Sequence, residues 1–98
     1  MEIEKISLAE YGRRGNKKFG TDRKLWRYKC PKCGGIQTYQ DFMDNEIFDP
    51  DDKYMFSCIG RWVKGRGCDW TLGGSFKIHK MEVKTLDGKY HPIFEFAE

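Results

Sequence analysis

The sequence has no long apolar run. No stretch of its 98 residues approaches the roughly 20 consecutive apolar residues that a membrane-spanning helix needs. The first residues also lack the apolar segment of a secretory signal. We therefore expect a soluble, intracellular protein of the cytoplasm.

Groups that carry catalysis are scarce. The two histidines are His79 and His91, and neither has a second histidine or a set of metal-binding carboxylates beside it in sequence. A phosphate-binding glycine loop and a nucleophile with its base are also missing. We expect structural or surface roles for both histidines, no catalytic residues and no enzyme activity.

Apolar residues make up only 39% of the chain, whereas aromatic residues reach 15%. The length leaves room for one domain, residues 1–98, without two independent cores. A few large aromatic side chains and a bound metal would then replace the aliphatic core of a larger protein.

Cysteine is also rare, but its four positions form a pattern. Cys30 and Cys33 are separated by two residues and followed by Gly34, which is the spacing of a zinc knuckle. Cys58 and Cys68 would complete the site, although nine residues separate them. Four thiolates close the coordination shell, so we expect one structural zinc ion.

Two other interpretations of the cysteines stay open. Two disulfides would fit the even number of cysteines, but a close Cys-x-x-Cys pair in a reducing compartment favours metal or redox chemistry. A thioredoxin-like redox pair would need a βαβ setting that the sequence does not indicate.

The pattern predicts an α+β fold of zinc-ribbon type, with antiparallel β-hairpins around the four-cysteine site and one or two short helices. Ser7 and Glu10 indicate a capped helix over residues 8–18, with Leu8 and Tyr11 on its buried side and Gly20 at its end. An inserted helix and loop, capped by Asp41, is expected over residues 40–52. The strands are expected at residues 25–30, 36–39, 54–58, 68–72, 76–83 and 90–96, the last two joined by an Asp87-Gly88 turn.

The charges are segregated although the net charge is only +3. Residues 11–33 carry nine Lys or Arg and one acid, residues 34–57 carry six acids and one Lys, and residues 58–85 are again basic. Two segments carry cations that could contact nucleic acid. The first has Arg13, Arg14, Lys17 and Lys18, and the second is the loop in which Arg61, Lys64 and Arg66 surround Trp62, a ring on which a base could stack. A solvated basic face, with Trp62 buried, explains the same residues without a ligand.

Three runs carry a family resemblance: Cys30-Pro31-Lys32-Cys33-Gly34, Cys58-Ile59-Gly60-Arg61-Trp62 and Gly67-Cys68-Asp69-Trp70. The chain resembles small zinc-ribbon-like proteins encoded by bacteriophages and prophages, over most of its length. The resemblance implies metal binding and a location in the host cell cytoplasm, and it implies no particular activity.

Together these features favour a non-enzymatic structural-zinc protein that binds DNA or RNA, with both cationic surfaces on one side of the molecule. The alternative is a module that docks on a host protein of transcription, replication or defence, using the acidic segment between Asp41 and Asp52. The sequence gives no oligomeric state.

Overall fold

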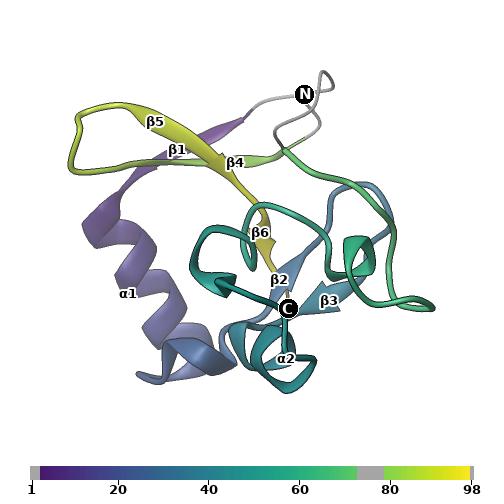
Figure 1. Ribbon diagram of the computed structural model, residues 1–98. Helices are drawn as coiled ribbons and strands as arrows, with labels where there is room; N and C mark the ends of the chain where they lie inside the picture. The colour runs from purple at the N-terminus through teal and green to yellow at the C-terminus, as the bar shows by residue number, and fades with distance from the viewer. Residues whose placement is uncertain (1–2, 73–78, 98) are drawn as a thin grey trace.

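The computed structural model describes residues 3–72 and 79–97, and over them the chain is an α+β fold with two three-stranded sheets (Figure 1). The first sheet has the order β1-β4-β5, with bounds Glu4–Ser7, Met81–Lys84 and Tyr90–Ile93. The second has the order β3-β2-β6, with bounds Ile36–Gln37, Tyr28–Lys29 and Glu95–Phe96. The helical segments are α1 (Leu8–Phe19), α2 (Tyr39–Asp44) and the 3₁₀ turns η1 (Arg23–Leu25), η2 (Pro50–Asp52) and η3 (Ile59–Arg61). None of the helices described is long and apolar enough to cross a membrane.

The first sheet mixes parallel and antiparallel pairing. β4 and β5 form an antiparallel hairpin whose turn contains Gly88 at φ 81°, as the Asp-Gly pair predicts. β1 pairs in parallel with β4, and this strand is not among those expected from the sequence. Within the strand predicted over residues 76–83, β4 begins at Met81 and residues 79–80 precede it, whereas residues 76–78 lie outside the described residues.

Helix α1 begins and ends close to the predicted residues. The Ser7 side chain accepts a hydrogen bond from the Glu10 backbone N–H, and Gly20 ends the helix at φ 89°. Tyr11 is buried as expected, but Leu8 is 41% exposed because it lies in the first turn, at the edge of the buried face.

The core joins both sheets and is dominated by aromatic rings. Trp26, Tyr28 and Phe94 are fully buried, and Phe96 stacks on Tyr11 with ring centroids 5.4 Å apart. Buried aliphatic side chains of the first sheet and two of the cysteines belong to the same cluster: Ile6, Met81, Val83, Ile93, Cys30 and Cys58. The core therefore reaches from the hairpin of the first sheet to the thiols.

The strands predicted near the cysteines are shorter than expected or absent. Of residues 25–30 only Tyr28–Lys29 form a strand (β2), after η1, and of residues 36–39 only Ile36–Gln37 do (β3). Residues 54–58 and 68–72 meet at the single bridge Ser57–Thr71, and residues 54–56 form a turn. The apolar run before Cys58 folds back because the backbone N–H groups of Phe56 and Ser57 donate to the C=O of Lys53. This compact turn, rather than a strand, delivers Cys58.

The inserted segment also differs from its prediction. Thr38 caps α2 and Asp41 completes a capping box from the third helical position, so Asp41 is not the cap itself. The helix ends at Asp44, and Phe42 is buried under it. Phe48 lies in the loop beyond the helix and is 85% exposed.

Candidate metal centre

The four cysteines meet at one point of the structure. Their Sγ atoms all lie within 4.8 Å of one another, with 3.7 Å between Cys30 and Cys68 and 3.8 Å between Cys33 and Cys58. Four sulfurs about 2.3 Å from a central zinc would be about 3.8 Å apart at tetrahedral angles. The cluster could therefore hold a metal ion such as zinc.

The first half of the cluster is a tight turn. The Cys30 N–H donates to the C=O of Gly35, and the Gly34 N–H donates to the C=O of Cys30, both at 2.9 Å. Gly34 has φ 75°, a conformation that favours glycine. The Gly35 N–H lies 3.3 Å from the Cys33 Sγ, so the turn also directs a backbone dipole at one thiol.

The second half reaches the same point by a longer route. The chain leaves Cys58 through η3 and returns so that the Cys68 N–H lies 3.2 Å from the Cys58 Sγ. Gly60 and Gly67 make this return possible. A Cβ on Gly60 would lie 2.1 Å from the C=O oxygen of Arg66, and one on Gly67 would lie 2.4 Å from the Cys58 Sγ. The nine residues between the two cysteines are thus a closed loop rather than an interruption of the site.

Gln37 attaches the second half of the cluster to the first, a role that sequence reasoning missed. Its side chain is 1% exposed, and its Nε2 donates to the C=O groups of Tyr54 and Ser57 at 2.8 Å each. Its Oε1 accepts from the Ile59 N–H at 2.8 Å. A glutamine shortly beyond a Cys-x-x-Cys-Gly turn gives no sequence signal that separates this role from that of a surface residue.

The thiols differ in their tendency to ionise in the absence of metal. Burial raises the pKa of Cys30 to about 12. Burial alone would also raise the pKa of Cys33, but the Gly35 N–H and the neighbouring thiols outweigh it and lower that pKa. Burial raises the pKa of Cys68, against the opposing hydrogen bond from the Trp70 N–H. A cation at the centre would favour the thiolate form at every position.

The basic residues predicted on α1 are partly neutralised. Arg14 forms a paired contact with the Glu4 carboxylate at 2.8 Å and also contacts Glu10 at 2.7 Å. Arg13 pairs with Glu10 as well. Lys17 and Lys18, in the last turn, are exposed.

The predicted loop between the third and fourth cysteines uses its arginines internally. Arg61 donates to the Asp69 C=O at 2.8 Å, and Arg66 donates to the Ile36 C=O and lies 3.6 Å from the Asp41 carboxylate. Lys64 is exposed. These contacts give Arg61 and Arg66 a structural role at the metal centre.

Trp62 lies at the surface, contrary to the interpretation that buries it. Its side chain is 42% exposed, with the Phe42 ring centroid 5.8 Å from its own. In Figure 1, α1 lies at the left of the molecule and the green segment of residues 59–67 at the right. In this view the two cationic segments lie on either side of the second sheet.

Neither histidine belongs to a catalytic cluster in the part of the chain described. His79 is buried and its Nε2 lies 2.7 Å from the Glu82 carboxylate. His91 is exposed, 3.0 Å from the Asp87 carboxylate at the β4–β5 turn.

Comparisons with known proteins give one match. No curated protein and no solved structure matches the chain. A protein-family model described as VVA0879-like matches residues 7–97, which include α1, the strands β2 to β6 and all four cysteines. The chain belongs to the VVA0879-like family.

Proposed function

We propose that this chain is a non-enzymatic, phage-encoded protein that holds a single structural zinc ion and binds nucleic acid through an exposed cationic surface. The donor set supports a structural metal. Four cysteine thiolates leave no coordination position for a reacting water, whereas catalytic zinc sites keep one open. The metal would act by holding the two halves of the cluster, and the surfaces attached to them, in place.

The observation that carries the binding proposal is the exposure of cations over residues 17–32. The acid in this stretch is Asp22, whose carboxylate accepts from the Lys24 N–H and caps η1. All seven Lys and Arg side chains of the stretch are exposed: Lys17, Lys18, Arg23, Lys24, Arg27, Lys29 and Lys32. Clustered exposed cations with little opposing charge are the electrostatic feature that attracts a phosphate backbone.

The same stretch is tied to the metal centre. Lys29 is in β2, directly before Cys30, and Lys32 lies within the cysteine turn with its Nζ 5.7 Å from the Trp70 ring. Holding the thiols together would fix the backbone that carries these two cations. The contact surface that we propose is therefore the basic stretch of residues 17–32 rather than the loop that contains Arg61.

Fluorescence anisotropy with a labelled oligonucleotide tests this proposal. We expect binding that weakens between about 50 mM and 200 mM salt, with a log–log slope near −0.7 for each phosphate contacted on a single strand. Replacing Arg27 and Lys29 by glutamate should abolish it. The matched control replaces Lys84 and Lys89, two exposed lysines of the β4–β5 hairpin, by glutamate. Equal losses in the two double variants, at unchanged metal content, would contradict the proposal.

A docking role on a host protein is the second candidate, and Phe48 favours it. This ring is 85% exposed, between Glu46 at φ 55° and Asp49 at φ 52°. Left-handed conformations at non-glycine residues are rare and occur often at functional sites. The segment combines an exposed ring with acids and would suit a basic protein surface that contains an apolar pocket.

Co-purification separates the two candidates. A host protein that stays bound in stoichiometric amount after nuclease treatment, and is lost on Phe48→Ser, would favour docking. Leu86→Ser is the matched control, because Leu86 is 95% exposed but lies in the β4–β5 turn. Retention of the protein by the Phe48 variant would remove the support for this candidate.

A further inference from the structure

A cavity of about 220 Å³ lies between α1, η1 and the β4–β5 hairpin. Its lining is mainly apolar and includes Leu8, Tyr11, Met55, Val83 and Ile93. The polar residues of the lining are Arg23, Thr85 and His91. We call this space the hairpin cavity.

The register of the first sheet directs the hairpin residues of the lining to one face. Val83 pairs with His91 across the hairpin, and the Thr85 N–H extends the ladder by donating to the C=O of Lys89. Because successive residues of a strand alternate between faces, Thr85 and Ile93 lie on the same face as the Val83–His91 pair. Figure 1 shows the hairpin above α1, and the cavity is enclosed between them.

The volume of the hairpin cavity limits its occupant. An apolar cavity of about 150 Å³ is large enough to hold benzene, whereas sites for drug-sized ligands begin at about 300 Å³. The hairpin cavity therefore fits one ring or one branched aliphatic chain. It is too small for a whole nucleotide.

Arg23 brings an unpaired positive charge to this apolar space. Its Cζ lies 5.1 Å from the centroid of the buried Trp26 ring, and within the described part of the chain its side chain has no hydrogen bond or ion pair. A guanidinium that contacts a ring keeps its N–H donors available for an anion. Burial raises the pKa of Tyr11 and the charge of Arg23 opposes this rise, so the guanidinium acts on a side chain that lines the cavity.

The other two polar residues of the lining already have partners. The Thr85 hydroxyl donates to the Asp87 carboxylate at 2.6 Å, and the His91 Nε2 lies 3.0 Å from the same carboxylate. The Lys89 N–H also donates to Asp87. Arg23 is therefore the group of the lining that can select a ligand by its charge.

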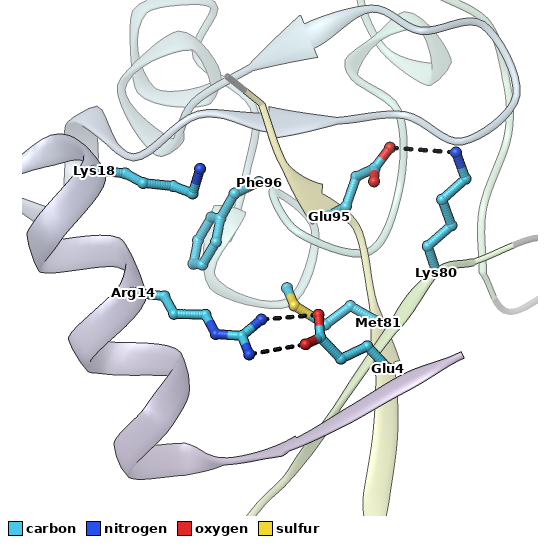
Figure 2. Close-up of a pocket in the computed structure, with 7 residues that line it drawn as sticks. All are labelled: Glu4, Arg14, Lys18, Lys80, Met81, Glu95 and Phe96. Atoms are coloured by element: carbon cyan, nitrogen blue, oxygen red, sulfur yellow. Dashed lines mark hydrogen bonds and ion pairs between the residues drawn. The ribbon is translucent and has the colours of Figure 1, made fainter. Parts of the chain in front are cut away.

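A larger hollow, between α1 and β6, offers no such cation. Figure 2 shows Arg14 with two of its nitrogens directed at the Glu4 carboxylate, each at 2.8 Å, and Lys80 facing Glu95 at 3.8 Å. Lys18, which also lines that hollow, has an interaction partner within the protein. The comparison singles out the hairpin cavity as the place where apolar surface and an unpaired cation meet.

We propose that the hairpin cavity binds a small apolar carboxylate, with its ring or branched chain between α1 and the hairpin and its carboxylate on the Arg23 guanidinium. Burial of the apolar part supplies affinity, and charge-assisted hydrogen bonds from Arg23 select the anion over a neutral analogue. This site is separate from the contact proposed for nucleic acid and does not depend on it.

Isothermal titration of the metal-loaded protein with three probes tests the proposal: phenylacetate, the neutral phenylacetamide and acetate, which lacks the ring. We expect phenylacetate to bind at least tenfold more tightly than either of the others. Arg23→Gln should reduce the affinity for phenylacetate to that for phenylacetamide and leave the latter unchanged. Leu8→Ala, which removes part of the apolar lining, should weaken the binding of both ring compounds.

Lys24→Gln is the matched control, because it removes the neighbouring cation of η1, which does not line the hairpin cavity. It should leave phenylacetate binding unchanged, as should the Arg27 and Lys29 double variant. Metal content and circular dichroism verify that each variant folds. Equal affinities for phenylacetate and phenylacetamide, or equal losses in the Arg23 and Lys24 variants, would overturn the proposal. Absence of phenylacetate binding up to about 10 mM would also overturn it.

Discussion

Gln37 and Ile59 are joined by a buried hydrogen bond, in which the side-chain oxygen of Gln37 accepts from the Ile59 backbone N–H at 2.8 Å. The same side chain donates to two backbone carbonyls that precede Cys58 in the chain. One residue of β3 therefore fixes the position of Cys58 relative to the first cysteine turn.

Replacing Gln37 by leucine should destabilise the protein strongly. The variant leaves three backbone groups without their partner, and each buried unsatisfied group costs about 1–3 kcal/mol. We expect the free energy of unfolding of the metal-loaded protein to fall by about 3 kcal/mol or more, measured by urea titration of tryptophan fluorescence. The control is Gln40→Leu, which removes only a surface contact with Asp44. A similar small change in both variants would show that Gln37 does not hold the cysteine loop.

Gly67→Ala should weaken metal binding. The new methyl group would lie 2.4 Å from the Cys58 Sγ, so the sulfur has to move. Gly65→Ala is a close control, because Gly65 also has positive φ but a methyl group there would have no neighbouring atom within 4 Å. Competition with a chromogenic chelator measures the affinity. The explanation fails if the two variants lose metal equally, since backbone strain is then sufficient.

The two glycines within α1 should respond in opposite ways to alanine. A Cβ on Gly12 would make an ordinary contact with Arg23 at 3.5 Å, so Gly12→Ala should stabilise the helix by about 0.5–1 kcal/mol. A Cβ on Gly15 would lie 2.1 Å from the buried Trp26 ring, and such overpacking costs about 1–3 kcal/mol. Thermal unfolding of both variants measures the difference. A stabilised Gly15 variant would contradict the close approach of α1 to Trp26.

Removing the metal should disrupt the aromatic core. Cys30 and Cys58 pack in the same buried cluster as Trp26 and Tyr28. Without a metal ion nothing holds the four sulfur atoms together, and their separation would disturb the ring contacts. Structural zinc contributes about 10–16 kcal/mol in small domains, which exceeds most of the usual range of folding stability. We expect a chelator to abolish the near-ultraviolet circular dichroism and added zinc to restore it. An unchanged spectrum at complete metal loss would show that the core is independent of the metal.

Alkaline pH should unfold the protein through its buried tyrosines. Burial raises the pKa of Tyr11, Tyr28 and Tyr54 above the ordinary value of 10.0, and the Tyr11 and Tyr28 hydroxyls are hydrogen-bonded to each other. Above pH 10 the unfolded chain loses these protons and the folded chain keeps them, so stability is lost as the pH rises. The slope approaches about 1.4 kcal/mol per pH unit for each tyrosine.

Urea titrations between pH 8 and pH 12 measure this slope, and absorbance at 295 nm should show tyrosinate appearing together with unfolding. Tyr28→Phe removes one titrating group and should reduce the slope. Gradual ionisation without unfolding would contradict the assignment of these hydroxyls to the core.

The features that the sequence predicts well depend on local chemistry. The Cys30–Gly34 turn, the Ser7 cap and the Asp87-Gly88 turn each follow from the conformational preferences of a few neighbouring residues. The structure reproduces them close to the expected positions. The gathering of the four thiols follows from their chemistry and from the glycines between them.

The features that were missed depend on residues far apart in the chain. β1 is a strand only because β4 pairs with it from the opposite end of the sequence. The run before Cys58 is composed of residues that favour strands. The Gln37 side chain, however, donates hydrogen bonds to two backbone C=O groups of this run, those of Tyr54 and Ser57, and thereby favours the turn. From the sequence, Gly15 only weakens the predicted helix. The structure shows that the Trp26 ring occupies the space that a Cβ at this position would need.

Phe94 is the single residue between β5 of the first sheet and β6 of the second. It is fully buried, and its N–H donates to the Met55 C=O at 2.8 Å. Because only one residue connects the two sheets here, we expect that neither sheet can open to solvent without displacing the other. We expect the amide protons of the β4–β5 hairpin and of the cysteine turn to exchange in one shared opening event, which makes a domain with two small sheets behave as a single cooperative unit.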